Sequence, residues 1–271
     1  MKRRLFQIGS LLISNSYFAS VFRSNIYQGW FKGVCIPFMN CYGCPLAMVS
    51  CPIGTLQHFV IIKAVPFLLI GFLGIIGLVV GRMTCGWLCP FGFAQEMLHK
   101  IKTPKLYPSR VFNYTKYLSL IVLTILVAFL VGEPWFCKLC PVGTLEAGIP
   151  IVSWNPSGDI FTQGGSILSR VGLLFYAKLF ILFAFVSAAI FIHQPFCRYA
   201  CPLGAIYSIF NKVSFFQMKI YSEKCGFFHE YHQICPMDLY VHQTPNDKDC
   251  IRCLNCTKCR SVSFKPFWRR W

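Results

Sequence analysis

Three long apolar runs constrain the folding of this chain more than any other feature of its sequence. They cover residues 58–81, 114–132 and 171–193. A helix needs about 20 mainly apolar residues to cross the roughly 30 Å hydrocarbon core of a bilayer, and each run meets that length. Residues 5–22 are also apolar, although they include Gln7 and Asn15. The sequence therefore predicts an all-α integral membrane protein with four transmembrane helices.

Lysine and arginine are unevenly distributed among the segments that join these runs. With a cytoplasmic N-terminus, the inner segments hold 20 Lys and Arg and the outer segments hold 4, the bias typical of cytoplasmic loops. The net charge of +17 is therefore assigned to anionic lipid and partner proteins, not to nucleic acid. We expect a multi-pass protein of the cytoplasmic membrane with both termini in the cytoplasm. No convincing cleavage site follows residues 5–22, so this first segment is expected to be retained.

A Cys-Pro-x-Gly motif occurs four times in the chain, at Cys51, Cys89, Cys140 and Cys201. One copy precedes and one follows the second apolar run, and the same arrangement surrounds the fourth run. The chain therefore resembles two copies of one unit. Proline restricts the backbone of the preceding cysteine, and glycine permits the tight turn that a ligand loop needs.

The predicted topology separates the membrane-domain cysteines into an inner and an outer set. The inner set comes from two C-x3-C-P motifs and consists of Cys85, Cys89, Cys197 and Cys201. A [4Fe-4S] cluster needs four thiolates, and this set supplies that number.

The outer set has more cysteines than one cluster needs: Cys35, Cys41, Cys44, Cys51, Cys137 and Cys140. The preferred ligands are Cys44, Cys51, Cys137 and Cys140, because Cys51 and Cys140 share the context CP-x-G-T-L. Cys41 could replace Cys44. The spare cysteines could be free, join a larger site, or form a disulfide if the outer side is oxidising.

The C-terminal residues predict a second domain. Residues 1–212 are assigned to the membrane domain and residues 213–271 to a cytoplasmic ferredoxin-like tail. Two-cluster ferredoxins repeat C-x2-C-x2-C-x3-C-P, in which the fourth cysteine serves the other cluster. One such ligand set is complete in this chain: Cys235, Cys250, Cys253 and Cys256.

The second ferredoxin set is incomplete. Phe228 and Tyr231 occupy two of its cysteine positions, and Cys259 lies one residue early without the following proline. Cys225 and Cys259 are therefore interpreted as remnants. The sequence predicts one intact [4Fe-4S] site in the tail, and about three clusters in the whole chain.

Zinc is the main alternative to iron and sulfide, since paired cysteines also build zinc sites. A zinc site from Cys225, His229, His232 and Cys235 is disfavoured because it would take Cys235 from the better cluster set. Haem is not expected, because the chain has no C-x-x-C-H attachment motif. Of the histidines close to the apolar runs, only His99 and His193 share a side, while His58 is on the other.

Several longer segments resemble a known family. They are N-C-Y-x-C-P around Cys41 and Cys44, CGWLCPFG around Cys85, FCRYACPLGAIYSIFN around Cys197, and CIRC at Cys250. At these motifs the chain resembles the ferredoxin-type membrane proteins of the NapH/NosR class, especially their four-helix polyferredoxin-like branch. The resemblance implies electron transfer between a quinone pool or cytosolic donor and a reductase partner. The incomplete second ferredoxin set departs from that pattern.

These observations predict a membrane electron-transfer protein, more readily a subunit of an oxidoreductase complex than an enzyme with its own catalytic residues. Lys63 and Lys178 lie inside apolar runs, where charged groups are candidates for binding a cluster or a quinone headgroup; snorkelling to the surface is the simpler explanation. Two other functions remain open: a copper-reducing or metal-handling assembly factor of the CcoG type, and a zinc-stabilised membrane scaffold.

Overall fold

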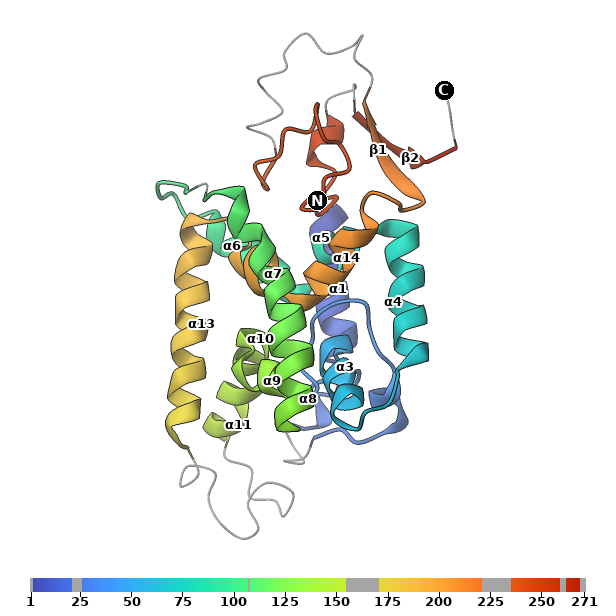
Figure 1. Ribbon diagram of the computed structural model, residues 1–271. Coiled ribbons are helices and arrows are strands. Elements are labelled where there is room, and N and C mark those ends of the chain that lie inside the picture. Colours follow the sequence, from blue (N-terminus) through green and yellow to red (C-terminus); the bar gives the residue numbers. More distant parts are fainter. Residues whose placement is uncertain are drawn as a thin grey trace.

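The computed structural model describes residues 2–20, 26–106, 108–154, 171–220, 235–258 and 262–268. They form a mostly helical body with a small sheet at one end (Figure 1). The first half contains α1 (Lys2–Ser14), η1 (Trp30–Gly33), α3 (Pro52–Ile61), α4 (Phe67–Val80), α5 (Met83–Trp87) and α6 (Pro90–His99). The second half contains η2 (Arg110–Tyr114), α7 (Thr115–Leu118), η3 (Ser119–Leu126), α8 (Val127–Val131), α9 (Trp135–Leu139), α10 (Pro141–Gly143), η4 (Thr144–Gly148), α11 (Ile149–Trp154), α13 (Leu173–Phe191), η6 (Phe196–Ala200) and α14 (Pro202–Phe210).

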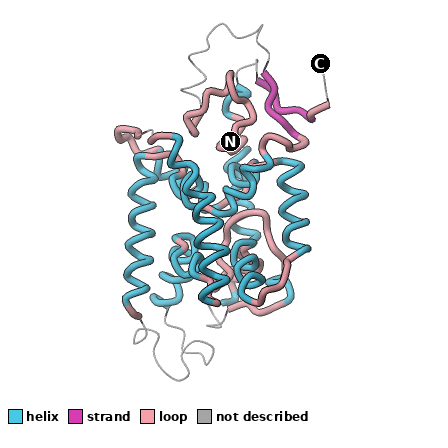
Figure 2. The backbone as a smooth tube through the Cα atoms, viewed as in Figure 1, coloured by secondary structure: helices cyan, strands magenta, loops and turns pink. Residues whose placement is uncertain are grey.

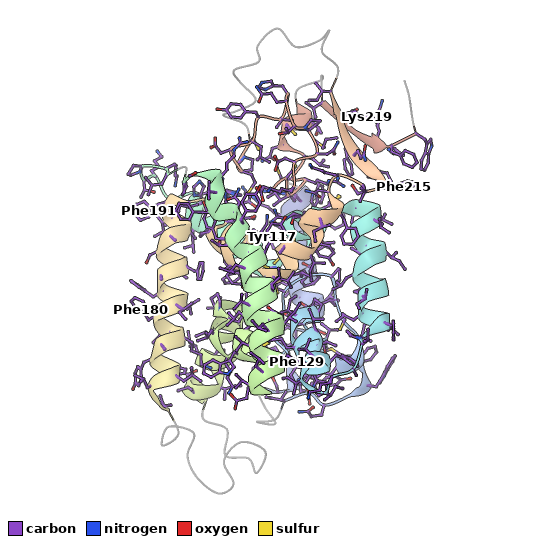
Figure 3. All side chains as sticks on the ribbon, in the orientation of Figure 1. Tyr117, Phe129, Phe180, Phe191, Phe215 and Lys219 are labelled. Atoms are coloured by element: carbon purple, nitrogen blue, oxygen red, sulfur yellow. The ribbon has the colours of Figure 1, made fainter. Side chains whose placement is uncertain are left out.

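Two helices are long and apolar enough to cross a membrane, judged by length and composition. One runs without interruption from Arg110 to Val131, through η2, α7, η3 and α8, and the other is α13. Only 17% and 11% of their most apolar stretches are buried. Phe180, for example, is 72% exposed and projects outward from α13 (Figure 3). Such extensive apolar exposure favours lipid over water as the surrounding medium.

The other two predicted spans are shorter in the structure than in the sequence-based prediction. The run 58–81 is divided, because α3 ends at Ile61 and α4 begins at Phe67. Pro66 lies in this break, where it lacks a backbone N–H and disfavours helical geometry in the residue before it. Helix α1 ends at Ser14, and Asn15 donates its side-chain amide to Leu11 O. The four-span count is therefore not confirmed.

Each Cys-Pro-x-Gly motif begins a short helix. Cys51, Cys89, Cys140 and Cys201 are the N-caps of α3, α6, α10 and α14, and the proline occupies the first turn. Proline fits there because the first N–H groups of a helix have no acceptor within the helix. Helices α3 and α10 lie in the half of the body farther from the sheet, while α6 and α14 lie in the half beside it (Figure 1).

The tail is not helical throughout, which corrects the all-α prediction. Strands β1 (Phe216–Ile220) and β2 (Val262–Pro266) pair antiparallel, with Met218 opposite Phe264. The cysteine-bearing loop beside them contains the short helix η8 (Asn255–Lys258) and is otherwise irregular (Figure 2). Met218, Val241, Cys256 and Val262 bury one another in a small apolar cluster. The sheet thus covers one side of the loop that carries the tail cysteines.

Candidate iron–sulfur cluster sites

The inner cysteines Cys85, Cys89, Cys197 and Cys201 share one site between α5, α6, η6 and α14. All four are buried in the same apolar core. Burial raises the pKa of Cys89 to about 12, and the nearby Cys85 adds to the rise. Burial and the neighbouring thiolates likewise raise the pKa of Cys197 and of Cys201. Four such thiolates repel one another, so they need bound cations such as iron to ionise together.

The glycine of the inner motifs allows two backbone segments to approach closely. A Cβ at Gly92 would be 3.1 Å from Cys85 O, and a Cβ at Gly204 would be 3.0 Å from Cys197 O. The N–H groups of Gly92 and Gly204 lie 3.4 Å from the Sγ atoms of Cys89 and Cys201. Neither glycine has a positive φ, so close approach, and not a tight turn, explains the motif. A thiolate at a helix N-terminus is stabilised by the N–H groups there.

Buried cations surround the inner cysteines. Arg82 is fully buried and donates to Cys197 O at 3.0 Å. Arg198 and Lys116 are also buried, and the carboxylate of Asp249 contacts both Lys116 and Arg82. Three buried cations thus accompany one buried carboxylate. A thiolate-held [4Fe-4S] cluster is a negative site and fits this excess of positive charge.

Replacing Asp249 with asparagine is expected to destabilise the fold by about 3–5 kcal/mol, because it leaves buried Lys116 and Arg82 without their counter-ion. The matched control is Glu133→Gln, which breaks the exposed pair of Glu133 with Lys138 and should cost at most about 1 kcal/mol. Thermal unfolding of the two variants in detergent checks this expectation. Equal losses would show that the buried network does not hold the structure together.

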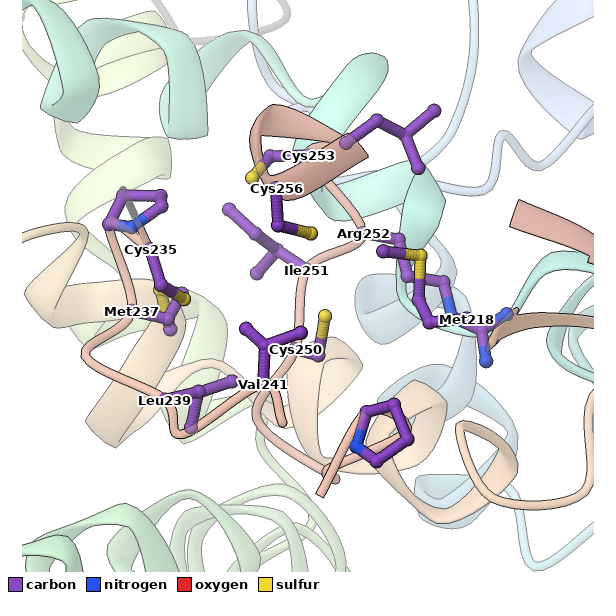
Figure 4. A pocket seen from close by; sticks show the side chains of 13 residues that line it. Met218, Cys235, Met237, Leu239, Val241, Cys250, Ile251, Arg252, Cys253 and Cys256 are labelled. Atoms are coloured by element: carbon purple, nitrogen blue, oxygen red, sulfur yellow. The ribbon is translucent and has the colours of Figure 1, made fainter. Parts of the chain in front are cut away.

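The four intact tail cysteines also come together. Cys235, Cys250, Cys253 and Cys256 line one small cavity, and Met237, Leu239 and Ile251 contribute apolar walls (Figure 4). Burial, and after it the neighbouring thiolates, raises the pKa of Cys256 to about 12. This is the ligand set that the ferredoxin pattern predicts. The remnant positions Cys225, Phe228, His229, Tyr231, His232 and Cys259 lie outside the described residues.

The tail site lies directly against the inner site. Ile251 O is so close to Gly86 that a Cβ added there would be 2.4 Å from it. Trp87 Nε1 donates to Arg252 O at 3.0 Å, and Asn211 Nδ2 donates to Cys250 O at 2.7 Å. The loop of Cys85 and the loop of Cys250 are therefore in backbone contact.

The outer cysteines line a cavity of about 550 Å³ between α3 and α10. Its cysteines are Cys41, Cys51, Cys137 and Cys140. The structure thus brings Cys41, and not the preferred Cys44, into the set. Cys41 N donates to Glu146 Oε2 at 2.6 Å, which ties this loop to the second half. Burial raises the pKa of Cys44, and the N–H groups of Leu46 and Ala47 in its own turn oppose the rise.

The remaining candidate residues do not line the outer or the tail cavity, although Cys35 lies beside Thr55 on the wall of the outer one. Cys35 Sγ lies 3.3 Å from Thr55 Oγ1, and no pair of described cysteines forms a disulfide. Lys63 Nζ stands over the ring of Phe129, and Lys178 lies on α13; neither lines the outer or the tail cavity. Nothing in their surroundings tests a role in cofactor binding, which stays a prediction.

The outer and inner sites are linked through one buried residue. Cys51 Sγ lies 3.9 Å from Met39 Sδ, and the backbone N–H of Met39 lies against Cys89, where it opposes the rise of the thiol pKa. Cys51, Cys140 and the four inner cysteines belong to one continuous apolar core. The outer loop therefore dips into the protein body, and a single buried residue, Met39, bridges two cysteine sets.

Three polar residues that the sequence analysis did not single out hold the cysteine loops. Gln57 Oε1 accepts from Cys137 N at 3.2 Å, and Gln95 Nε2 donates to Cys197 Sγ at 3.4 Å; Glu146 accepts from Cys41 N. Each lies six positions after a motif cysteine and reaches a loop of the other half of the chain. The sequence could have revealed these residues, because each of the four seven-residue segments that begin with a Cys-Pro-x-Gly motif ends on a side chain with a polar group.

Among the residues that the structure describes, no group of three or more His, Cys, Asp or Glu side chains has the arrangement to hold a single metal ion.

Comparisons with known proteins agree with this chemistry. A family model described as a 4Fe-4S binding domain matches residues 62–107, 117–149 and 174–221. An uncharacterized protein of Methanocaldococcus jannaschii is 31% identical over 76% of this chain and 81% of its own length. The regulatory protein NosR of Stutzerimonas stutzeri is 27% identical over 64% of this chain and 22% of its own. YccM of Escherichia coli, named for a proposed role in electron transport, is 24% identical over 72% of this chain and 53% of its own.

No solved structure matches the chain. The family model and the archaeal relative together cover the inner motifs and most of the membrane domain. The chain therefore belongs to the family of ferredoxin-type 4Fe-4S proteins that includes NosR and YccM.

Proposed function

We propose that this protein is a membrane-bound electron carrier that relays single electrons through three [4Fe-4S] clusters. The inner cluster is held by Cys85, Cys89, Cys197 and Cys201, and the tail cluster by Cys235, Cys250, Cys253 and Cys256. The outer cluster is held by Cys41, Cys51, Cys137 and Cys140. One end of the relay exchanges electrons with a cytosolic or quinone-pool partner and the other with a partner redox enzyme. The role in electron transport agrees with the name of YccM.

The contact of all three cysteine sets within one chain carries this proposal. Gly86 and Ile251 join the inner and tail loops by backbone contact, and Met39 joins the inner and outer sets. Electron transfer needs short gaps through packed protein, and these contacts supply them. They support a relay without the gap of roughly 30 Å that clusters at opposite membrane surfaces would leave.

The membrane placement rests on the two long apolar helices and the charge distribution. Both helices expose most of their apolar side chains, which lipid accommodates. We propose that the end with α6, α14 and the tail faces the cytoplasm, because the segments assigned to that side carry most of the Lys and Arg. Helices α1 and α4 then lie within the membrane as shorter elements, α1 packed against α5 and α6 and α4 against α3 and α14.

Iron and acid-labile sulfide content of anaerobically purified protein tests the proposal. Three four-thiolate sites predict about twelve iron and twelve sulfide per chain. EPR of the dithionite-reduced protein should show [4Fe-4S]⁺ signals. A value near eight would mean that one cysteine set does not hold a cluster. Zinc without sulfide would overturn the electron-transfer function.

A further inference from the structure

The four motif helices carry a side chain with a polar group at the same position. Gln57, Gln95, Glu146 and Tyr207 each lie six residues after the cysteine of a Cys-Pro-x-Gly motif. Three of these side chains make the hydrogen bonds described above, each to a cysteine loop of the other half. By this internal pattern, Tyr207 on α14 should reach the loop of Cys85.

Tyr207 does lie at that loop. Its side chain is completely buried in the core that contains the inner cysteines. Burial, and after it the nearby Cys85 and Cys201, raises the pKa of the Tyr207 hydroxyl. The neighbouring Thr84 lies one residue before Cys85 and is buried as well. The Tyr207 side chain therefore stands between both C-x3-C-P motifs of the inner site.

Among the described residues, the hydroxyl of Tyr207 makes no hydrogen bond of normal geometry, and neither does Thr84 Oγ1. Thr84 lies beside the Tyr207 hydroxyl and opposes the rise of its pKa, but the two oxygens are not aligned as a hydrogen-bonded pair. A buried hydroxyl without an acceptor is unfavourable, and native proteins rarely leave one so. Cys85 and Cys201 lie near this hydroxyl, so a group held by the inner cysteines would satisfy it.

We propose that the Tyr207 hydroxyl donates a hydrogen bond to a sulfur of the inner [4Fe-4S] cluster. This inference rests on the proposed function, since it assumes that the inner cysteines hold such a cluster. Hydrogen bonds to cluster sulfurs help to set the reduction potential. A donated bond stabilises the reduced cluster more than the oxidised one, because the reduced cluster carries one more negative charge. Tyr207 therefore makes the inner cluster easier to reduce than its cysteines alone would.

Tyr207→Phe tests this with the loss of one oxygen atom. In the full-length protein with its clusters, a potentiometric titration followed by EPR should show the inner cluster at a lower midpoint potential, with the other two unchanged. A Cys201→Ser variant, which alters one ligand, identifies the inner signal. The matched control is Tyr117→Phe, because the Tyr117 hydroxyl already pairs with Ser208 Oγ at 2.6 Å. The control should leave all three potentials where they were.

A second substitution keeps the test decisive if Tyr207→Phe assembles poorly. Incorporation of 3-fluorotyrosine at position 207 keeps the shape and makes the hydroxyl a stronger donor, so the inner potential should rise. An unchanged inner potential in either fully loaded variant overturns the inference. Wild-type protein without iron and sulfide would instead overturn the proposed function, so the two failures are distinguishable.

Discussion

Replacing Cys41 with alanine is expected to lower the iron content from about twelve to about eight per chain, while replacing Cys44 with alanine should leave it at about twelve. The structure places Cys41, with Cys51, Cys137 and Cys140, on the wall of the outer cavity, and Cys44 outside it. A cluster that loses one of its four thiolates is expected to be lost, because thiolates are the ligands that hold such a cluster. Iron and sulfide analysis of both variants gives the result.

The pair is well matched for this comparison. Both substitutions remove a thiol from the same short loop, and neither side chain is freely exposed. A general loss of stability would therefore affect both variants alike. If Cys41→Ala kept its iron and Cys44→Ala lost it, the outer ligands would be Cys44, Cys51, Cys137 and Cys140, the set preferred from the sequence. Loss of iron in both would mean that the outer site is larger than four ligands.

Gly86→Ala separates the tail site from the inner site. A Cβ at this position would be 2.4 Å from Ile251 O, a backbone atom that cannot turn aside as a side chain can. The tail loop must therefore shift, at a cost of about 1–3 kcal/mol for overpacking. We expect the magnetic interaction between the reduced inner and tail clusters to weaken in EPR, and electron transfer between them to slow. All iron should be retained, because no ligand changes.

Gly74→Ala is the control for this substitution. Gly74 lies inside α4, where an added Cβ meets nothing within 4 Å. Alanine stabilises a helix interior relative to glycine, so the stability of this variant should be unchanged or slightly higher. An EPR interaction in Gly86→Ala equal to that of Gly74→Ala would show that the Gly86–Ile251 contact does not set the distance between the two sites.

The iron–sulfur chemistry could be predicted from the sequence because short motifs determine it locally. Cys89-Pro and Cys201-Pro each produce an N-cap followed by proline in the first helical turn, whatever the rest of the chain does. The family identified from these motifs is confirmed by the comparisons. The tail set could likewise be assembled residue by residue, since a ferredoxin motif holds its spacing within a few residues.

Hydropathy gave a less accurate account of the membrane domain. Hydropathy correctly indicated the two helices that the structure shows to be of spanning length. It did not show that the run 58–81 breaks near Pro66, because averaging hydropathy over a window hides the effect of a single proline. The sheet of the tail was also missed. Its strands β1 and β2 are short and far apart in the chain, and such pairing has no local signal.

The sequence by itself determined which cysteines are available in each half and which chemistry they support, because ligand type and spacing are local properties. Only the tertiary structure placed Cys41, and not Cys44, on the wall of the outer cavity, where Glu146, more than a hundred residues away, accepts the N–H of Cys41. It alone placed Met39 between Cys51 and Cys89. It also placed the Tyr207 hydroxyl near the inner cysteines, where it makes no hydrogen bond of normal geometry to a described residue. These relations arise where the two halves pack together, and packing between distant segments is not encoded in any short stretch of sequence.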